Sequence, residues 1–301
     1  MTEPGFRSGF AAFVGRPNAG KSTLINAIVG QKVAIVSDKP QTTRHRLRAI
    51  LDRPEAQVVF VDTPGLHKPE DALGEELNTS ALMALRDVDV ACLLIDASKP
   101  VGTGDAWVAK HVGGAKCARL LILTKADLVD EDRLTRQLEA ATALAKFDEV
   151  VVVSAIEGFN VEGVVTSVIE MLPAGPRYFP PGMPTDQPLE VMLAEFIREK
   201  VLLKTFDEIP HAVGVALDDL RFDKKRDMTT ITATIYVERD SQKGMLIGRG
   251  GDMIKAIGTD ARPDMERLLG TKVFLDLRVK VRDKWRKDAE QVRRFGYGQG
   301  L

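Results

Sequence analysis

The chain has 301 residues, of which 44% are hydrophobic and 28% charged, and its formal net charge is −1. This composition is typical of globular proteins and excludes a wholly disordered chain, while the length favours two domains. Two cysteines exclude a disulfide framework and a four-cysteine zinc site, and no apolar run reaches the ~18 residues of a membrane span. The start of the sequence lacks the apolar core of a signal peptide, so we expect a cytoplasmic protein.

The first 172 residues alternate short apolar runs with helix-like segments. Uninterrupted apolar runs of four to six residues are typical of strands that are covered on both faces of a parallel sheet. Strands are predicted over 9–14, 58–61, 90–95, 120–123 and 150–153, with an additional strand over 46–51 antiparallel to 58–61. Helices are predicted over 21–29, 75–86, 105–112, 131–146 and 161–171. This alternation predicts a doubly wound α/β domain with helices on both faces of the sheet.

Six prolines between Pro173 and Pro188 interrupt this pattern. Proline lacks a backbone donor and fixes φ, so neither a helix nor a central strand is expected there. We therefore predict a first domain over 1–172, a proline-rich linker over 173–188 and a second domain over 189–301.

The second domain follows a different pattern, that of a small α+β sandwich. The predicted order is a helix over 189–203, strands over 212–220 and 229–238, a glycine-rich turn, short helices over 252–257 and 263–269, a strand over 273–281 and a charged helix over 283–294. In the strand 229–238, Ile231 and its alternate neighbours share one face, while threonines and Tyr236 share the other.

Basic residues gather at the C-terminal end. Residues 241–301 carry 14 Lys and Arg against 8 Asp and Glu, a net of +6 that leaves −7 for residues 1–240. A basic end on an acidic body favours a polyanionic partner. A solvated helical face would account for the same charges, so composition alone leaves both interpretations open.

Residues 15–22 read GRPNAGKS and match the phosphate-loop pattern G-x-x-x-x-G-K-[ST], between a predicted strand and a predicted helix. The glycines let backbone N–H groups turn inward around a phosphate, and the helix N-terminus favours its negative charge. Lys21 is expected to reach the β- and γ-phosphates, and the Ser22 hydroxyl to ligate Mg²⁺. The pattern predicts a nucleotide site built from Gly15, Arg16, Pro17, Asn18, Ala19, Gly20, Lys21, Ser22 and Thr23.

Three further motifs each close a predicted buried strand. In DTPG at 62–65, Asp62 is expected to hold Mg²⁺ through water and the Gly65 N–H to meet the γ-phosphate. In TKAD at 124–127, the Asp127 carboxylate can accept from N1–H and N2–H₂ of guanine, donors that adenine lacks, for roughly a 10²–10⁴-fold preference. A backbone N–H at 154–155 could meet the guanine oxygen. The candidate contacts are Asp62, Thr63, Pro64, Gly65, Leu66, Thr124, Lys125, Ala126, Asp127, Ser154 and Ala155.

With these motifs in this order, residues 8–172 resemble the translation-factor-like P-loop GTPases. GRPNAGKS, QTTRHR at 41–46, DTPG and SAIEG at 154–158 specifically resemble the Era family of ribosome-assembly GTPases. The resemblance implies GTP or GDP and Mg²⁺ as ligands. It also implies that a threonine of the first switch senses the γ-phosphate, and we favour Thr43 over Thr42 because Thr43 directly precedes an arginine.

The resemblance completes the expected site. It implies a K⁺ ligand at Asn18, which could instead merely cap the loop. The groups expected to act in hydrolysis are Lys21, Thr43, Gly65 and Asn18, and those expected to hold Mg²⁺ are Ser22, Thr43 and Asp62. Two positions depart from familiar patterns: Thr124 stands where the family usually has Asn, and Leu66 stands where Ras-like enzymes have the water-orienting glutamine. Slow intrinsic hydrolysis is therefore expected.

Residues 246–251 read LIGRGG and carry a G-x-x-G pattern just before a predicted helix. In KH domains such a loop clamps about four nucleotides, because its glycines let the backbone approach the phosphates. The predicted order of helices and strands around it matches the type II KH arrangement. The candidate RNA contacts are Lys243, Ile247, Gly248, Arg249, Gly250, Gly251, Lys255, Arg278 and Lys280, of which the last two could instead face solvent.

Residues 189–301 also resemble the Era family, through GTDAR at 258–262, LDLRVKV at 275–281 and Trp285. This resemblance implies the 3′ end of small-subunit (16S) rRNA as partner and small-subunit maturation as the task. Gly250 stands where the family often has lysine, which puts one phosphate contact in doubt. We expect Trp285 to pack against the sheet rather than stack on a base. The terminal basic residues Lys284, Arg286, Lys287, Arg293 and Arg294 form a further candidate phosphate patch.

Two classes of function fit these motifs. The first is a GTP-hydrolysing switch that binds the 16S rRNA 3′ end and acts in rRNA processing and 30S assembly. The alternative is an RNA-binding assembly factor in which GTP is mainly a structural ligand, and a P-loop kinase is a distant third. We expect a monomer with no DNA partner, and the basic C-terminus could also contact the cytoplasmic membrane peripherally.

Overall fold

The computed structural model describes residues 5–285 except 40–41, 45–46, 67–71 and 207–208, together with the backbone but not the side chains of 72–74, 76 and 211. The chain divides into two compact units. Within the described residues, the first comprises 5–36 and 43–186, and the second comprises 37–42 and 187–285.

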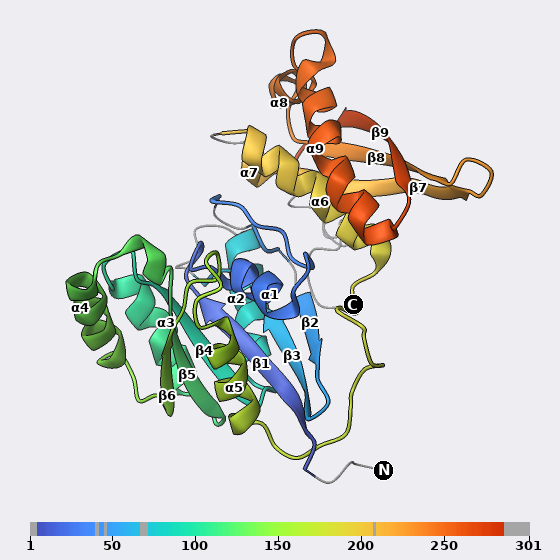
Figure 1. The fold of residues 1–301 in the computed structure, drawn as a ribbon. Coiled ribbons are helices and arrows are strands. Elements are labelled where there is room, and N and C mark those ends of the chain that lie inside the picture. Colours follow the sequence, from blue (N-terminus) through green and yellow to red (C-terminus); the bar gives the residue numbers. More distant parts are fainter. Residues whose placement is uncertain (1–4, 40–41, 45–46, 67–71, 207–208, 286–301) are drawn as a thin grey trace. The chain divides into compact units, whose positions relative to one another are not determined.

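The first unit is built on a six-stranded sheet in the order β2-β3-β1-β4-β5-β6 (Figure 1). Its strands are β1 (Arg7–Gly15), β2 (Leu47–Asp52), β3 (Ala56–Asp62), β4 (Val90–Asp96), β5 (Ala118–Thr124) and β6 (Glu149–Val152). All are parallel except β2, which pairs antiparallel with β3. The mostly parallel sheet and its antiparallel edge strand are confirmed.

Helices cover both faces of this sheet because alternate strand residues point to opposite sides. In β1, Phe13 belongs to the core beneath α1 (Lys21–Val29) and α5 (Val161–Met171). Val14 belongs to the core on the other face. That face is covered by α2 (Ala72–Ala84), α3 (Thr103–Gly113) and α4 (Glu131–Thr142). The doubly wound class is confirmed, although α2 begins and α4 ends earlier than predicted.

The proline-rich segment 173–188 contains no helix or strand, but it is hydrogen-bonded to strands of the first unit. The Ile50 N–H donates to the Pro184 carbonyl at 2.8 Å, and the Gln57 side chain accepts from the N–H groups of Tyr178 and Phe179 at 2.7 and 2.9 Å. The segment therefore lies along β2 and β3 as far as Asp186, where the first unit ends.

The second unit has a three-stranded sheet in the order β7-β8-β9, with β7–β8 antiparallel and β8–β9 parallel (Figure 1). A parallel pair needs a crossover connection, which α8 and α9 supply. The elements are α6 (Leu189–Lys204), α7 (Ile209–Ala212), β7 (Gly214–Asp223), β8 (Met228–Val237), α8 (Asp240–Ile247), the 3₁₀ turn η2 (Arg249–Gly251), α9 (Asp252–Leu269) and β9 (Lys272–Val281). The predicted second domain class, α+β, is confirmed.

Three helices of this unit differ from the prediction. The first, α7, was not expected, and it ends at Ala212, so the strand predicted over 212–220 begins only at Gly214. The two short helices expected over 252–257 and 263–269 form one helix, α9, with Pro263 inside it. Ile257, Ala261 and Met265 are all fully buried, and their spacing of four continues one apolar stripe across the proline. Packing of this stripe outweighs the cost of the proline. The expected glycine-rich turn is partly α8, whose Leu246 is also fully buried.

Trp285 packs into the second unit as predicted. Its indole is buried against Ala216 and Tyr236, and its N–H donates to the Ala212 carbonyl at 2.8 Å. The basic helix predicted over 283–294 falls mostly outside the described residues. Within the part of the chain that the structure describes, no helix is both long and apolar enough to cross a membrane.

Candidate functional site

The phosphate loop runs from the end of β1 to the start of α1, and Lys21 lies inside it. The Lys21 ammonium donates to the Arg16 carbonyl at 3.2 Å and to the Gly15 carbonyl at 3.5 Å. Burial lowers the pKa of Lys21, and the nearby Asp62 carboxylate opposes this shift. A desolvated ammonium surrounded by backbone is well suited to an anionic ligand, because such a ligand favours its charged form.

Ser22, Thr43 and Asp62 converge from α1, the segment after α1 and the end of β3. The Ser22 hydroxyl donates to Asp62 Oδ2 at 2.6 Å and lies 3.2 Å from Thr43 Oγ1, which is 3.4 Å from the same carboxylate oxygen. Burial raises the pKa of Asp62, against the opposing effects of Lys21 and Ser22. Within the described chain, Asp62 Oδ1 is buried without a hydrogen-bond partner. Two hydroxyls and an unpartnered carboxylate oxygen fit a Mg²⁺ ion and its water.

Thr42 and Thr43 point to different partners. Thr43 Oγ1 faces Ser22 and Asp62, as described above, whereas the Thr42 hydroxyl donates to the Lys39 carbonyl at 2.6 Å. Of these two threonines, it is therefore Thr43 whose hydroxyl lies beside Ser22 and Asp62. Gln41, His45 and Arg46 of the same motif lie outside the described residues.

The DTPG motif is held against the phosphate loop. The Thr63 hydroxyl donates to the Phe13 carbonyl at 2.8 Å, and the Leu66 N–H donates to the Gly15 carbonyl at 2.9 Å. A Cβ added to Gly65 would lie 2.7 Å from backbone atoms of Pro17, closer than real Cβ contacts come. Only glycine fits here. Leu66 is fully buried in the core beneath α3 and offers no proton-transfer group.

The phosphate loop is also tied to neighbouring elements. Arg16 Nη1 lies 3.1 Å from Asp105 Oδ2 at the start of α3, and this carboxylate oxygen also accepts from the Gly102 N–H at 2.9 Å. Asn18 adopts a left-handed backbone with φ 65°, which asparagine tolerates better than most residues.

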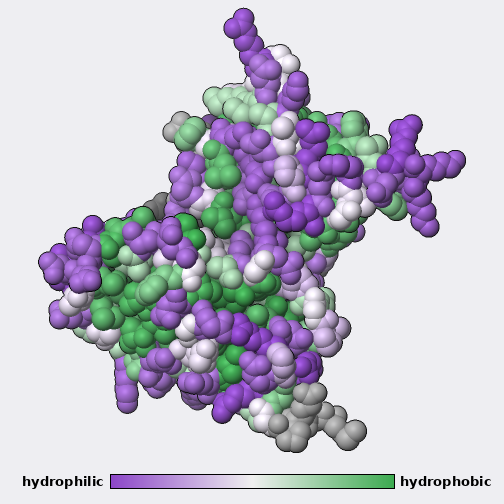
Figure 2. Space-filling view, in the orientation of Figure 1, coloured by the Kyte–Doolittle hydropathy of each residue, from purple (hydrophilic) through white to green (hydrophobic). Residues whose placement is uncertain are grey.

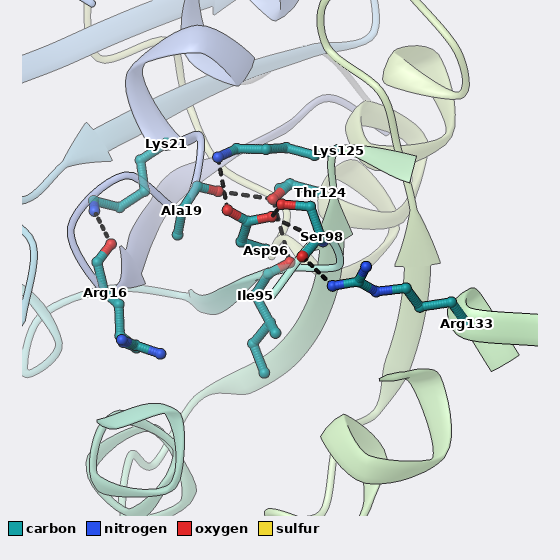
Figure 3. Close-up of polar contacts among 9 residues, drawn as sticks. All are labelled: Arg16, Ala19, Lys21, Ile95, Asp96, Ser98, Thr124, Lys125 and Arg133. Carbon is teal, nitrogen blue, oxygen red and sulfur yellow. Dashed lines mark hydrogen bonds and ion pairs between the residues drawn. The ribbon is translucent and has the colours of Figure 1, made fainter. Parts of the chain in front are cut away.

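The TKAD motif begins at the end of β5, beside the phosphate loop (Figure 3). The Thr124 hydroxyl lies 2.8 Å from the Ala19 carbonyl oxygen and 3.2 Å from that of Ile95. Threonine thus retains a side-chain link to the phosphate loop at the position where the Era family usually has Asn. Lys125 and Ala126 turn the chain into η1 (Ala126–Leu128), which leaves Asp127 exposed.

Ser154 and Ala155 follow β6. The Ser154 N–H donates to the Phe159 carbonyl at 3.1 Å, and the Ser154 hydroxyl accepts from the Glu157 N–H at 3.3 Å. Since the Ser154 N–H is engaged, Ala155 is the better candidate for a backbone donor to a guanine oxygen.

The G-x-x-G loop connects α8 to α9 in the second unit. Gly248, Gly250 and Gly251 all have positive φ, at 74°, 62° and 88°, so the loop needs the conformational freedom of glycine. Arg249 and Lys255 are exposed beside it, with Ile247 and Lys243 half-buried on α8. A backbone of this kind at the N-terminus of an 18-residue helix suits phosphate binding.

A pocket of about 310 Å³ lies between α9 and β9, and of its lining residues only Lys255 is among the candidate RNA contacts predicted from the sequence. Gly258, Thr259 and Arg262 line it from α9, and Leu275 and Leu277 from β9. Strand alternation puts Arg278 and Lys280 on the opposite face of β9, where both are exposed. Arg278 and Lys280 therefore do not line this pocket.

Exposed charge also gathers at the turn between β7 and β8, which projects to the right in Figure 2 as a hydrophilic tip. The exposed charged residues of this turn include Lys224, Lys225 and Arg226.

Among the described residues, no group of three or more His, Cys, Asp and Glu side chains could hold a metal ion. Of the four histidines, His45 and His67 and the His211 side chain fall outside the description, and His111 packs on Trp107 at 4.6 Å between ring centroids.

Family models match both units. A model described as 50S ribosome-binding GTPase matches residues 10–125, and a KH domain model matches residues 208–286. The chain is similar over its length to GTPase Era of Mycolicibacterium smegmatis, with 46% identity covering 99% of this chain and 100% of the relative.

Solved structures agree with these matches. The chain is similar to Era in complex with MgGDPNP and nucleotides 1506–1542 of 16S ribosomal RNA, with a TM-score of 0.93 and 34% identity over 98% of this chain and 100% of the other. It is equally similar, by TM-score, identity and coverage, to a variant of Aquifex aeolicus Era bound to GDP and AlF₄⁻.

Proposed function

The chain belongs to the Era family of GTPases, and from this premise we propose that it hydrolyses GTP to GDP and phosphate, binds the 3′ end of 16S rRNA and acts in small-subunit assembly. The observation that carries the proposal is the convergence of phosphate loop, hydroxyls and carboxylate around Lys21, Ser22 and Asp62. A relative of the same fold, solved with MgGDPNP and 16S rRNA together, supports the assignment of both ligands.

We propose the following roles at the nucleotide. Lys21 and the loop N–H groups bind the β- and γ-phosphates, and Asp127 with the Ala155 N–H recognises guanine. Ser22, Thr43 and Asp62 hold Mg²⁺, which when bound neutralises negative charge on the phosphates. Asn18 is proposed as a K⁺ ligand, on the resemblance alone. With Leu66 buried, water must be positioned by backbone, by an ion or by a partner, so intrinsic hydrolysis is slow.

Replacing Gly65 by Ala is expected to weaken binding of a non-hydrolysable GTP analogue by roughly tenfold or more, while GDP affinity changes little. The added Cβ meets the Pro17 backbone at 2.7 Å, so the Gly65 N–H moves away from the γ-phosphate that it is proposed to contact. Titration of both nucleotides by fluorescence measures the effect. Gly114→Ala, where the nearest atom would be at 3.6 Å, is the matched control. Equal losses for GDP and the analogue would contradict the assignment.

For the RNA, we propose that the G-x-x-G loop clamps the backbone through Gly248, Arg249, Gly250 and Gly251. Lys243, Ile247 and Lys255 flank this contact, and the pocket between α9 and β9 receives the adjoining bases. Arg278 and Lys280 are kept as secondary candidates, since they face away from that pocket.

An oligonucleotide matching the 16S rRNA 3′ end is expected to bind the protein, and its affinities with the GTP analogue and with GDP, measured at one fixed salt concentration, give the sign of the coupling between nucleotide and RNA. Replacing Arg249 and Gly250 together by Asp should weaken this binding by roughly tenfold or more, because two negative charges then face the phosphates. Intrinsic GTP hydrolysis should stay unchanged.

The control for this variant replaces Arg136 and Gly114, both exposed on the first unit, by Asp and so makes the same change in charge. If it weakens RNA binding equally, the loop is not the contact. Equal affinity with both nucleotides would mean that the nucleotide does not gate RNA affinity. GTP hydrolysis that rises above its background in the presence of RNA would count against the alternative, an assembly factor for which GTP is mainly structural.

The remaining assignments follow the family. We propose a GTPase domain over 1–172, a linker over 173–188 and a KH-type domain over 189–301, in keeping with the matches to 10–125 and 208–286. A monomer acting at the ribosome in the cytoplasm is proposed, and peripheral membrane contact through the basic C-terminus is a secondary proposal.

A further inference from the structure

Asp96 closes β4 directly beside the guanine motif. It lies opposite Thr124 in the pairing of β4 with β5, and the next N–H, that of Ala97, donates to the Thr124 carbonyl at 3.0 Å. The Asp96 side chain is 9% exposed. The carboxylate therefore stands at the nucleotide end of the sheet, yet none of the motifs considered above includes it.

Lys125, the neighbour of Thr124, adopts a left-handed backbone with φ 59°. This conformation is unfavourable for a lysine and has to be held by its surroundings. It turns the chain out of β5 and into η1, where the Leu128 N–H donates to the Lys125 carbonyl at 3.1 Å. This turn presents Asp127, together with Leu128, to solvent.

Asp96 holds the Lys125 side chain. Asp96 Oδ2 lies 2.7 Å from Lys125 Nζ (Figure 3). With its ammonium bound, the stem of Lys125 is fixed as an apolar surface next to the phosphate loop. This ion pair thus holds the side chain of the residue whose backbone begins the turn.

Asp96 is itself fixed in place. Its other oxygen, Oδ1, accepts from the Ser98 N–H at 2.9 Å and from the Ser98 hydroxyl at 2.5 Å, and Arg133 from α4 donates to the Ser98 carbonyl (Figure 3). Burial would raise the pKa of Asp96, but the hydrogen bonds from Lys125 and Ser98 and the charge of Lys125 together lower it. The carboxylate is therefore ionised at neutral pH and already oriented.

We propose that Asp96 is a positioning residue for guanine recognition: it fixes Lys125 and with it the turn that presents Asp127 to the base. This inference rests on the proposed function, since it concerns the same nucleotide site. Asp96, at the end of β4, is thus proposed to affect recognition of the base rather than binding of the phosphates, and to do so through Lys125.

The test compares GDP with IDP, whose base lacks the exocyclic 2-amino group that Asp127 is proposed to bind. Asp96→Asn keeps the shape of the side chain and removes its charge. It should lower GDP affinity by about tenfold and IDP affinity much less, so that the GDP/IDP preference falls. A merely structural loss would lower both affinities equally and leave the preference unchanged, which would overturn the proposal.

A double variant tests whether Asp96 acts through Lys125 or by another route. Lys125→Met keeps the stem and removes the ammonium, so adding Asp96→Asn to it should cause no further loss of GDP/IDP preference. A full additional loss would show that Asp96 acts by another route. Asp148→Asn is the matched control, because Asp148 accepts from the Arg119 N–H at 2.8 Å before the start of β6, away from the TKAD turn. Failure of the unmodified protein to prefer GDP over ADP would instead defeat the proposed function.

Discussion

Replacing Lys21 by Ala is expected to lower the affinity for both GTP and GDP by about 10²–10⁴-fold, which corresponds to about 3–5 kcal/mol. The Lys21 side chain is buried, and its ammonium donates to loop carbonyls, where it is proposed to meet the β- and γ-phosphates. Removing it leaves buried negative charge on the ligand without its counter-charge. Equilibrium titration with a fluorescent guanine nucleotide measures the loss, and undiminished binding would refute the phosphate-loop assignment.

The same substitution should not unfold the protein in the absence of nucleotide. Burial lowers the pKa of Lys21, so the folded protein already holds this ammonium at a cost. We therefore expect the thermal midpoint of the nucleotide-free variant to stay level or rise, while stabilisation by added GDP disappears. Lys110→Ala, at an exposed position on α3, is the matched control and should bind nucleotide normally. A large fall in the midpoint without nucleotide would mean that loss of binding reflects misfolding.

Periodicity predicted most of the fold because the parallel strands carry unbroken apolar runs. Leu120, Leu121, Ile122 and Leu123 of β5 are all fully buried, so the run is visible without knowledge of its neighbours. The second unit was harder to predict where tertiary packing outweighs local preference. Pro263 and Gly258 both suggest a helix break, yet the stripe through Ile257, Ala261 and Met265 holds α9 together.

The nucleotide site was predictable to the extent that its residues fall in spaced motifs. The spacing of GRPNAGKS could identify Lys21 and Ser22, but it carried no information on the ion pair between Asp96 and Lys125. A signal was nevertheless present: Asp96 directly follows a buried apolar run, as Asp62 and Thr124 do. Polar residues that close neighbouring parallel strands meet at one edge of the sheet, so the same rule would have found it.

Replacing Asp127 by Asn is expected to change which base is bound. The carboxylate can accept from both N1–H and N2–H₂ of guanine, and each such bond contributes about 1.5–3 kcal/mol. Asparagine offers a donor in place of one acceptor, so GTP affinity should fall by roughly 10²–10⁴-fold. XTP should gain affinity, because its base has a carbonyl at the ring carbon that bears the 2-amino group in guanine. Asp127 is exposed, so the substitution should leave stability nearly unchanged.

Competition of GTP and XTP for the same labelled nucleotide measures this exchange, with Asp130→Asn as the control. Asp130 caps α4 by accepting from the Arg133 N–H, so it is a nearby carboxylate with a purely structural contact. Combining Asp127→Asn with Asp96→Asn gives the sharper result. If Asp96 acts by presenting the side chain at position 127, its loss should weaken XTP binding by the Asp127→Asn variant as it weakens GDP binding by the native protein. A variant of Asp127 that still prefers GTP would refute the guanine assignment, whatever the phosphate loop binds.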